Sequence, residues 1–414
     1  MCTCFIKRLL RKKSDKSAQS GGAALNGGIV AQRTALLQRE NGMKREDEGL
    51  AFLLKYENIA WYEKGAVRIL DRRIYPVKTE FVTCTDYKEV AQAIRDMVTQ
   101  SAGPYLAAAM GMALAAYQAV HASANIHTSA SAKNADAASI CAYCEKAAYD
   151  LSHARPTTVE QMKSIVEGSL NVIKKYAGTA SADEIVQAAF EYAFNYVNGN
   201  YKKYAVIGAH TADLIPQNGT VITQCFADTV TGTMLRSCRE SGKNVRIICA
   251  ETRPYFQGSR LTASVACDMG FPVTVITDNM CAFTMKTKNV DLFTSASDVI
   301  TIDGHIVNKV GTFQMALAAH YYGIPYYVTG TPDSKHADLS TVTIEERDGD
   351  AVLKAWDAKI TMDGVKGYYP AFDITPPELC SGVVTELGVY DPHRLADYLK
   401  DSKKRNKNRH LTEE

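Results

Sequence analysis

The spacing of hydrophobic and polar positions divides the patterned part of the chain into two halves. From about residue 58, two β-rich runs interrupted by Gly65 predict a small antiparallel hairpin. Helical spacing then predicts a helix with Thr85 or Asp86 as its N-cap. Further helices are expected at residues 107–120, 135–152, 158–176 and 182–196. We therefore expect residues 47–200 to form a mainly helical domain with a short antiparallel β element.

A different rhythm begins after Tyr204, where nearly continuous apolar runs alternate with helical segments. The strand-like runs are TVITQC, NVRIICAE, PVTVIT, VDLFTSA, GHIV and PYYVTG. Such alternation is typical of a parallel sheet covered by helices on both faces. The sequence therefore predicts an α/β fold, with a Rossmann-like, mostly parallel sheet domain over residues 201–395. No GxGxxG follows the first strand and no GxxxxGK[ST] occurs, so no motif supports a nucleotide site.

Charge is distributed unevenly over an otherwise ordinary composition. The 47 Lys and Arg and 45 Asp and Glu residues give a net charge of +2, but residues 1–17 supply +5 and residues 400–414 supply +3. The rest of the chain is therefore near −6, and we expect no nucleic-acid surface on the folded part. We interpret residues 1–46 as a disordered basic extension and residues 396–414 as a charged tail.

We predict neither a membrane segment nor a metal site. The uncharged run at residues 98–132 consists largely of Ala, Gly, Ser and Gln, which favours a buried helix over a membrane span. The eleven Cys residues lack the dense spacing of a secreted disulfide scaffold, which favours free thiols in a reducing cytoplasm. The one CxxC, Cys141 to Cys144, has no second pair at zinc-finger spacing, so we interpret it as two packed helix thiols.

Ligands of open α/β sheets bind beyond the carboxyl ends of the strands, so residues that follow a strand are candidates for chemistry. Cys225 ends the first such strand and precedes a helix, whose positive end would lower the pKa of the thiol; the alternative is a buried structural cysteine. Asp278 and Asp298 follow two further strands, where desolvation would raise the pKa of a carboxyl group toward that of a proton donor. Either could instead cap a helix, most simply Asp278, so the residues alone leave this choice open.

Two more polar segments lie at strand ends. The loop after the second strand of the predicted parallel sheet is crowded with Glu251, Thr252, Arg253, Gln257 and Arg260. Asn308 and Lys309 stand at a strand-to-helix junction, where an amide, an ammonium group and helix N–H groups could hold a phosphate. Asn-Lys pairs are also common on surfaces, so this signal is weak by itself.

In order and in spacing, these segments resemble the aldose 1-phosphate isomerase family. The blocks that carry the resemblance are ILDRRIYP, ARPT, ETRPYFQGSRLTA, GFPVTVITDNM, DGHIVNKVGT, TIEERD and PAFDITPPEL, within residues 58–392. The resemblance implies an isomerase that converts an aldose 1-phosphate, such as 5-methylthioribose 1-phosphate, to the ketose 1-phosphate by acid–base proton transfer. It implies a homodimer and no cofactor. The implied catalytic residues are Cys225 and Asp298, and the implied substrate-binding residues are Arg155, Gln257, Asn308 and Lys309.

The chain also departs from the family pattern. Gln100 stands where the family has an Arg that grips substrate, and Gln224 and Phe226 flank the cysteine in place of His and Asn. Ribose 1,5-bisphosphate and 5-deoxyribose 1-phosphate are therefore alternative substrates. Regulatory subunits of the translation initiation guanine-nucleotide exchange factor share the fold, so a non-catalytic regulator or sugar-phosphate-binding protein is the alternative function. A thiol and a carboxyl group together at one crevice favour catalysis.

Overall fold

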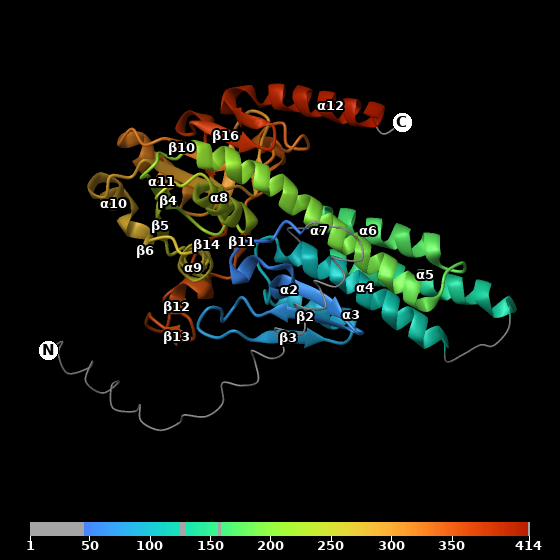
Figure 1. The fold of residues 1–414 in the computed structure, drawn as a ribbon. Coiled ribbons are helices and arrows are strands. Elements are labelled where there is room, and N and C mark those ends of the chain that lie inside the picture. Colours follow the sequence, from blue (N-terminus) through green and yellow to red (C-terminus); the bar gives the residue numbers. More distant parts are fainter. Residues whose placement is uncertain (1–44, 125–129, 156–158, 413–414) are drawn as a thin grey trace. The chain divides into compact units, whose positions relative to one another are not determined.

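The computed structural model describes residues 45–124, 130–155 and 159–412, so nearly all of the predicted basic extension lies outside the described residues. Residues Glu46–Glu414 belong to one compact unit. Within it, a group of long helices lies beside a mostly parallel sheet (Figure 1). The predicted α/β fold class is therefore confirmed.

The first half contains a three-stranded antiparallel sheet. Its strands are β1 (Ala60–Glu63), β2 (Ala66–Leu70) and β3 (Phe81–Cys84). The predicted hairpin joins β1 to β2, with Glu63 opposite Ala66. Gly65 has a φ of +78°, and a Cβ there would lie 2.5 Å from the ring of Tyr117, so the turn requires glycine. The sequence pattern does not predict β3, because only Cys84 of that strand is buried.

Helices make up the rest of the first half. They are η2 (Phe52–Leu54), α2 (Tyr56–Ile59), α3 (Tyr87–Arg95), α4 (Gly103–Ala124), α5 (Ala130–Ser152), α6 (Val159–Tyr176) and α7 (Ala182–Asp213). Asp86 is the N-cap of α3 and forms a capping box with Glu89. The alanine-rich α4 is almost wholly buried against α5, α6 and α7, as its composition predicts. None of the helices in the described ranges has both the length and the apolar character needed to span a bilayer.

The helix α7 is longer than its sequence pattern predicts. Its N-terminus carries a capping box in which Ser181 and Glu184 each bond the other's backbone N–H. From there the helix packs against α4 and α6, and near its C-terminal end against α8 and the sheet (Figure 1). The predicted division at residues 200 and 201 falls inside this helix, so the two halves as separate domains stay a prediction.

A seven-stranded sheet in the order β17-β16-β10-β7-β4-β5-β6 forms the second half. All neighbouring pairs are parallel except β16 and β17. The strands are β4 (Thr220–Thr223), β5 (Arg246–Ala250), β6 (Val273–Ile276), β7 (Leu292–Ala296), β10 (Tyr326–Thr329), β16 (Gly382–Thr385) and β17 (Gly388–Tyr390). Apolar side chains of the central strands, including Ile222, Phe293 and Val328, form the core.

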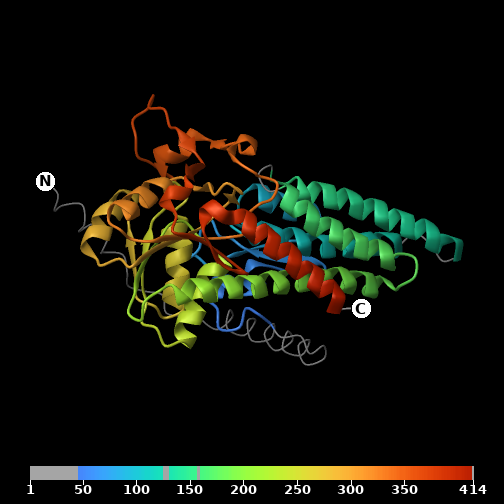
Figure 2. The same cartoon turned by 90° about the horizontal axis from the view of Figure 1, so that it is seen from above.

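Helices cover both faces of this sheet, as the alternating pattern predicts. They are α8 (Thr229–Glu240), the π-helical η4 (Gly258–Thr262), α9 (Ala263–Asp268), η5 (Asp278–Met280), α10 (Cys281–Thr287) and α11 (Thr312–Tyr321). α8 packs against α7 and α9, whereas α10 packs against α11 (Figure 2). The chain runs from β4 outward to β6 and then returns to the other side of β4 with β7. The boundary between β4 and β7 is thus the point at which the strand order reverses, where open α/β sheets bind ligands.

One predicted strand is not in this sheet. The GHIV segment forms β9 (Ile306–Lys309), which lies between β8 (Val299–Ile300) and β15 (Phe372–Thr375) in a separate antiparallel sheet. The prediction of a parallel strand is wrong because a short apolar run that is buried on both sides looks the same in either setting.

The chain between β10 and β15 is mostly irregular. Its short elements are η6 (Leu339–Thr341), β11 (Glu346–Arg347), η7 (Gly349–Leu353), β12 (Lys354–Ala355), β13 (Ala358–Lys359) and β14 (Tyr369–Pro370). We call residues 345–371 the 345–371 segment. β11 and β14 pair at its base, where Arg347 lies opposite Tyr369.

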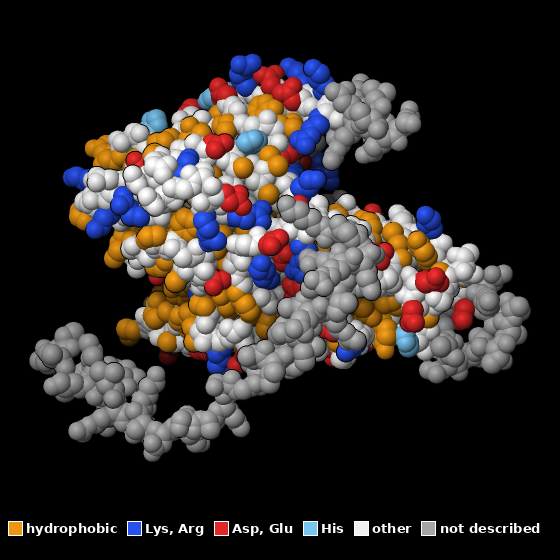
Figure 3. Space-filling view, viewed as in Figure 1, with side chains coloured by type: hydrophobic (Ala, Val, Ile, Leu, Met, Phe, Trp, Pro, Cys, Tyr) orange, Lys and Arg blue, Asp and Glu red, His pale blue; other side chains and the backbone are white. Residues whose placement is uncertain are grey.

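The C-terminal residues that we predict as a charged tail form a helix. η8 (Pro377–Leu379) and η9 (Pro392–Arg394) precede α12 (Leu395–Thr412). Leu395 and Tyr398 are buried, and the Tyr398 hydroxyl donates to Glu386 at 3.0 Å, so these contacts anchor the start of α12. Over the described residues on the face drawn in Figure 3, acidic and basic side chains are interspersed rather than gathered into one basic surface.

Candidate functional site

Cys225 follows β4 in an unusual backbone conformation. Its φ of +60° is in the left-handed region that residues with a Cβ seldom adopt. Two hydrogen bonds hold it there: its N–H donates to Thr252 Oγ1 at 2.9 Å, and its carbonyl accepts from Thr262 Oγ1. The side chain is partly exposed. The loops after β4 and β5 together therefore fix the position of the thiol.

Asp298 follows β7, the strand that pairs with β4. Its N–H donates to the Val307 carbonyl at 2.9 Å, which ties it to β9. The carboxyl group faces open space and has no hydrogen-bond partner among the described residues. Protein atoms around it are nevertheless dense enough that desolvation raises the pKa of Asp298, although the positive charges of Lys309, Arg155 and Arg347 oppose this shift.

Lys309 joins the thiol and the carboxyl group into one electrostatic cluster. Its side chain is 4% exposed, and its Nζ donates to the Ala371 carbonyl at 2.9 Å and to the Tyr369 hydroxyl at 3.2 Å. Burial lowers the pKa of Lys309, while negative charge on Cys225 or Asp298 would raise it. These mutual electrostatic effects place Cys225, Asp298 and Lys309 near one another where β4 and β7 end, and we call this place the recess.

Of the two interpretations of Cys225, the structure favours a desolvated cysteine over a thiol activated by a helix end. Burial raises the pKa of Cys225 to about 11, and Lys309 is the strongest group that opposes this shift. α8 begins only at Thr229, after a loop that ends at the N-cap residue Asp228. Because the helix dipole acts mainly within the first turn, desolvation outweighs it at Cys225.

Arg155 lies near the same recess, at the end of α5. Burial lowers the pKa of Arg155 first, and the positive charge of Arg347 lowers it further. Tyr105 is also close, since burial and the negative charge of Asp298 raise its pKa to about 12. Sequence reasoning missed Arg347 and Tyr105. Arg347 lies in the TIEERD block, whose density of charge was the available signal.

Asn308 serves a different contact from the one expected. Its Nδ2 donates to Thr312 Oγ1 at 3.0 Å, and that hydroxyl donates to Gln224 Oε1 at 3.1 Å. The N–H groups of Gly311 and Phe313 at the start of α11 donate to the Asp373 carboxylate. The predicted phosphate site at this helix end is therefore already occupied by a side chain, which is a correction to that expectation. Asn308 instead links β9 to the residue before Cys225.

Gln257 and Gln100 each bring a buried amide oxygen to the carboxyl end of the sheet. Gln257 is 7% exposed and Gln100 is 5% exposed, and the Oε1 atom of each has no hydrogen-bond partner in the described part of the chain. Gln100 belongs to a loop that packs on the Cys225 loop. Arg72 Nη1 bridges them, donating to the Gln100 carbonyl at 2.6 Å and to Asp228 Oδ2 at 3.0 Å.

The other polar residues of the loop after β5 hold structure. Asp278 accepts hydrogen bonds from the backbone N–H groups of Thr252 and Arg253 at 2.8 and 2.7 Å. The Arg253 side chain donates to carbonyls of Val352 and Lys354. The structure thus distinguishes the two aspartates in one respect. Negative charge on either raises the pKa of Cys225, but only Asp298 is also among the groups that shift the pKa of Lys309.

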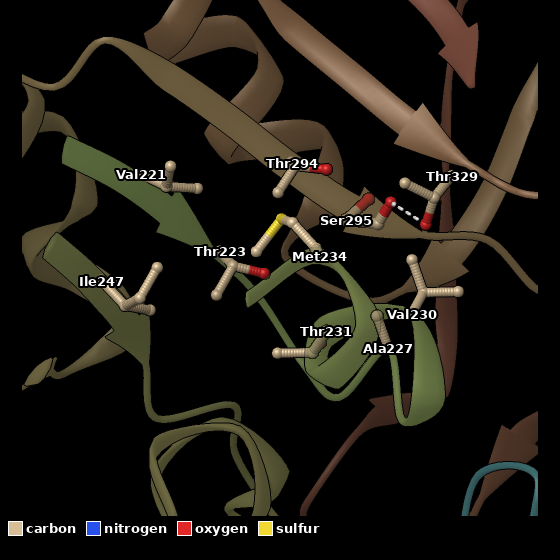
Figure 4. A pocket seen from close by; sticks show the side chains of 10 residues that line it. All are labelled: Val221, Thr223, Ala227, Val230, Thr231, Met234, Ile247, Thr294, Ser295 and Thr329. Atoms are coloured by element: carbon tan, nitrogen blue, oxygen red, sulfur yellow. Dashed lines mark hydrogen bonds between the residues drawn. The ribbon is translucent and has the colours of Figure 1, made fainter. Parts of the chain in front are cut away.

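A small cavity lies between α8 and the sheet and is separate from this cluster. Figure 4 shows side chains of α8 and its preceding loop facing those of the central strands. The cavity is lined by Val221, Thr223, Ala227, Val230, Thr231, Met234, Ile247, Thr294, Ser295 and Thr329. Its volume of about 20 Å³ is enough for water but not for a sugar phosphate.

Two bacterial relatives of this chain bear the same name. The chain is 33% identical over 343 residues to the methylthioribose-1-phosphate isomerase of Roseiflexus sp. (strain RS-1), which covers 80% of this chain and 94% of that protein. It is 35% identical over 349 residues to the enzyme of the same name from Chloroflexus aurantiacus, with 81% and 96% covered.

Similar solved structures include an isomerase and a translation initiation factor subunit. The 5-methylthioribose 1-phosphate isomerase of Pyrococcus horikoshii OT3 has a TM-score of 0.71 at 26% identity and covers 84% of this chain and 97% of its own. The delta subunit of translation initiation factor eIF-2B from A. fulgidus has a TM-score of 0.69 at 31% identity, with 81% and 96% covered. Residues 105–392 match the Initiation factor 2 subunit family. The chain therefore belongs to the Initiation factor 2 subunit family.

Proposed function

We propose that this protein is an isomerase that converts an aldose 1-phosphate to the corresponding ketose 1-phosphate. The observation that carries the proposal is the meeting of Cys225, Asp298 and Lys309 where neighbouring strands β4 and β7 end. The names of the relatives from Roseiflexus and Chloroflexus support the same reaction, with 5-methylthioribose 1-phosphate as the first substrate to test.

The chemistry requires one acid and one base. Because phosphate esterifies the anomeric oxygen, the sugar ring cannot open spontaneously. Protonated Asp298 would donate to the ring oxygen as the bond from that oxygen to C1 breaks, and the Cys225 thiolate would remove the proton from C2. The resulting enol loses its C2 hydroxyl proton to the Asp298 carboxylate, while Cys225 returns its proton to C1. This sequence gives the ketose 1-phosphate and restores both side chains.

The surroundings of the two groups fit these roles. A raised pKa keeps more Asp298 in the acid form that can donate. The base is harder to form, because burial raises the pKa of Cys225 to about 11, and the ammonium group of Lys309 is the chief opposing influence. Arg155 and Lys309 would bind the phosphate, and the unpaired amide oxygen of Gln257 could accept from a sugar hydroxyl. Asn308 would support the Cys225 loop through Thr312 and Gln224.

The competing function is regulation by protein contact without turnover. It is favoured by the similarity to the A. fulgidus delta subunit. A regulator has no need for a thiol and a carboxyl group in one cationic recess, so we rank it second.

We also propose that the protein is a homodimer and that it works in a reducing cytoplasm. Sedimentation velocity would test the oligomeric state.

Direct assay distinguishes these functions. The protein would be incubated with 5-methylthioribose 1-phosphate, 5-deoxyribose 1-phosphate and ribose 1,5-bisphosphate, and ketose formation followed by NMR. We expect conversion of at least one, and none with Cys225→Ser. Absence of conversion for all three, together with a sugar phosphate that raises the melting temperature, would support the regulatory function instead.

A further inference from the structure

Arg347 lies beside the proposed active site but comes from a remote part of the sequence. It belongs to β11 at the base of the 345–371 segment, opposite Tyr369, whose hydroxyl accepts a hydrogen bond from Lys309. Its side chain is 13% exposed. The paired strands β11 and β14 therefore bring this guanidinium group next to the lysine of the recess.

The guanidinium group is held in a fixed orientation. Arg347 Nε donates to Glu345 Oε1 at 2.8 Å and Nη2 donates to Glu345 Oε2 at 3.1 Å, a two-bonded pairing. The Ala371 N–H donates to the Glu345 carbonyl at 2.8 Å. The guanidinium carbon lies 5.5 Å from the centre of the Phe372 ring, and Lys309 Nζ lies 4.8 Å from it. The two cations thus share one aromatic ring.

Other buried arginines nearby are committed to the fold. Arg260 donates to the carbonyls of Arg72, Tyr75 and Tyr255, and Arg72 donates to Asp228 and to backbone carbonyls. Arg347 differs, because its side-chain partners are Glu345 and the hydroxyl of Tyr369, which also contacts Lys309, and not backbone carbonyls of the fold.

Three cations lie close enough to repel one another in the recess. The positive charge of Arg347 disfavours the charged forms of both Lys309 and Arg155. The acidic groups that face this cluster in the described part of the chain are Asp298, Glu345 and Asp373, together with the Cys225 thiol and the hydroxyls of Tyr105, Tyr255 and Tyr369. A carboxyl group that is to donate a proton must be neutral, so Asp298 does not contribute a negative charge, and Glu345 and Asp373 then face three positive charges. A bound dianion would relieve this repulsion.

We propose that Arg347, clamped by Glu345, is a third cationic ligand of the phosphate group, beside Lys309 and Arg155. This inference rests on the proposed function in taking the anion to be the phosphate ester of the substrate. Glu345 occupies the Nε side of the guanidinium group and fixes its orientation, so the N–H groups at its other side would give the phosphate a direction as well as a charge, and the sugar would be oriented between Cys225 and Asp298.

Isothermal titration of the full chain with inorganic phosphate tests the inference without any assumption about catalysis. Arg347→Gln should weaken phosphate binding by about tenfold or more, because a charged hydrogen bond is lost. Arg347→Lys should give an intermediate loss, since it keeps the charge without the fork. Lys354→Gln is the matched control, because it removes an exposed cation from the same segment and should leave binding unchanged.

Several results would overturn the inference. The first is that Arg347→Gln binds phosphate as tightly as the native chain does. The second is that Lys354→Gln loses as much phosphate affinity as Arg347→Gln does. Should Arg347→Gln fail to fold, as judged by circular dichroism, unchanged binding by Arg347→Lys would overturn it in the same way. With an active substrate, we expect Arg347→Gln to raise KM more than it lowers kcat. If no sugar is isomerised but Arg347→Gln still binds phosphate more weakly than the native chain, the proposed function is wrong and the proposed phosphate site is supported.

Discussion

Asp278 and Asp298 follow parallel strands of the same sheet, and the chain uses them differently. The Asp278 carboxylate accepts hydrogen bonds from two backbone N–H groups in the neighbouring loop. The Asp298 carboxyl group has no hydrogen-bond partner in the described part of the chain, and desolvation by the surrounding protein atoms raises its pKa. Asp278 stabilises a loop. Asp298 keeps its carboxyl group free of hydrogen bonds from the described residues, in surroundings that disfavour its ionised form.

Position in the sheet accounts for this difference. β6, which precedes Asp278, is an edge strand, whereas β7 adjoins β4 at the reversal of strand order. Only at that reversal do loops from two directions leave room for a ligand. Whether an acidic residue after a strand can act as a catalyst therefore depends on which strands lie beside that strand. The local sequence does not specify those neighbours.

The largest expected effect separates the two aspartates by rate. Asp298→Asn should lower kcat by at least about a hundredfold, because it removes the proposed proton donor. Asp278→Asn should leave the chemistry intact and change kcat only slightly. NMR assays of ketose formation on the two variants would measure this, and equal losses would contradict the assignment of separate roles.

The next prediction concerns the partner of Asp298. With a pKa of about 11, Cys225 should react with iodoacetamide about ten times faster for each pH unit between 7 and 10, because only the thiolate reacts. Lys309→Met should slow the reaction at pH 8, since the positive charge that favours the thiolate is lost. Mass spectrometry of the peptide that contains Cys225 separates it from exposed Cys267. A rate that levels off near pH 8 would show that the thiol is more acidic than its burial indicates.

A smaller effect should appear in the free energy of unfolding, which the Asn variants of Asp298 and Asp278 should change in opposite directions. The folded protein raises the pKa of Asp298, so it favours the neutral carboxyl group over the ionised one. The free energy of unfolding is therefore highest, as far as this group is concerned, below its unfolded pKa, and it falls as pH rises through its folded pKa. At pH 7, Asp298→Asn should therefore be more stable than the native chain, and this gain should vanish in acid. Asp278→Asn should lose about 1–3 kcal/mol through an unsatisfied backbone donor. Urea unfolding at pH 7 and pH 4 would test both signs.

The smallest effect supplies a scale for the stability changes. Ser181→Ala removes the capping box of α7, far along the chain from the recess, and should cost about 1 kcal/mol. Its kcat should match that of the native chain. If Ser181→Ala lowered kcat as much as Asp278→Asn did, the rate of either variant would reflect loss of folded protein and not its own role.

Local patterns predicted much of this fold. Gly65, the Asp86 cap and the apolar strands each follow from nearby residues, and all are present. The environment of β9 did not follow, because its partners β8 and β15 are chosen by tertiary packing. The extent of α7 was underpredicted because its later turns are only partly apolar.

Some residues of the candidate site were predicted from the sequence and others were not. Strand ends and family resemblance together nominated Cys225, Asp298 and Lys309, which the structure brings together. For Cys225 the sequence left an activated thiol and a buried cysteine as alternatives, and the pKa of about 11 agrees with the second. Arg347 was missed because the charged residues of TIEERD look like a solvated loop until β11 pairs with β14.

The continuous α7 has a consequence for exchanging parts between relatives. Its 32 residues correspond to about 48 Å of helix, which packs on the other long helices at one end and on the sheet at the other. Inserting or deleting a single residue midway would rotate one end against the other by about 100°. Chimaeras joined near residue 200 must therefore preserve helical phase, and recombination at that junction should be tolerated only when the two parents align there without gaps.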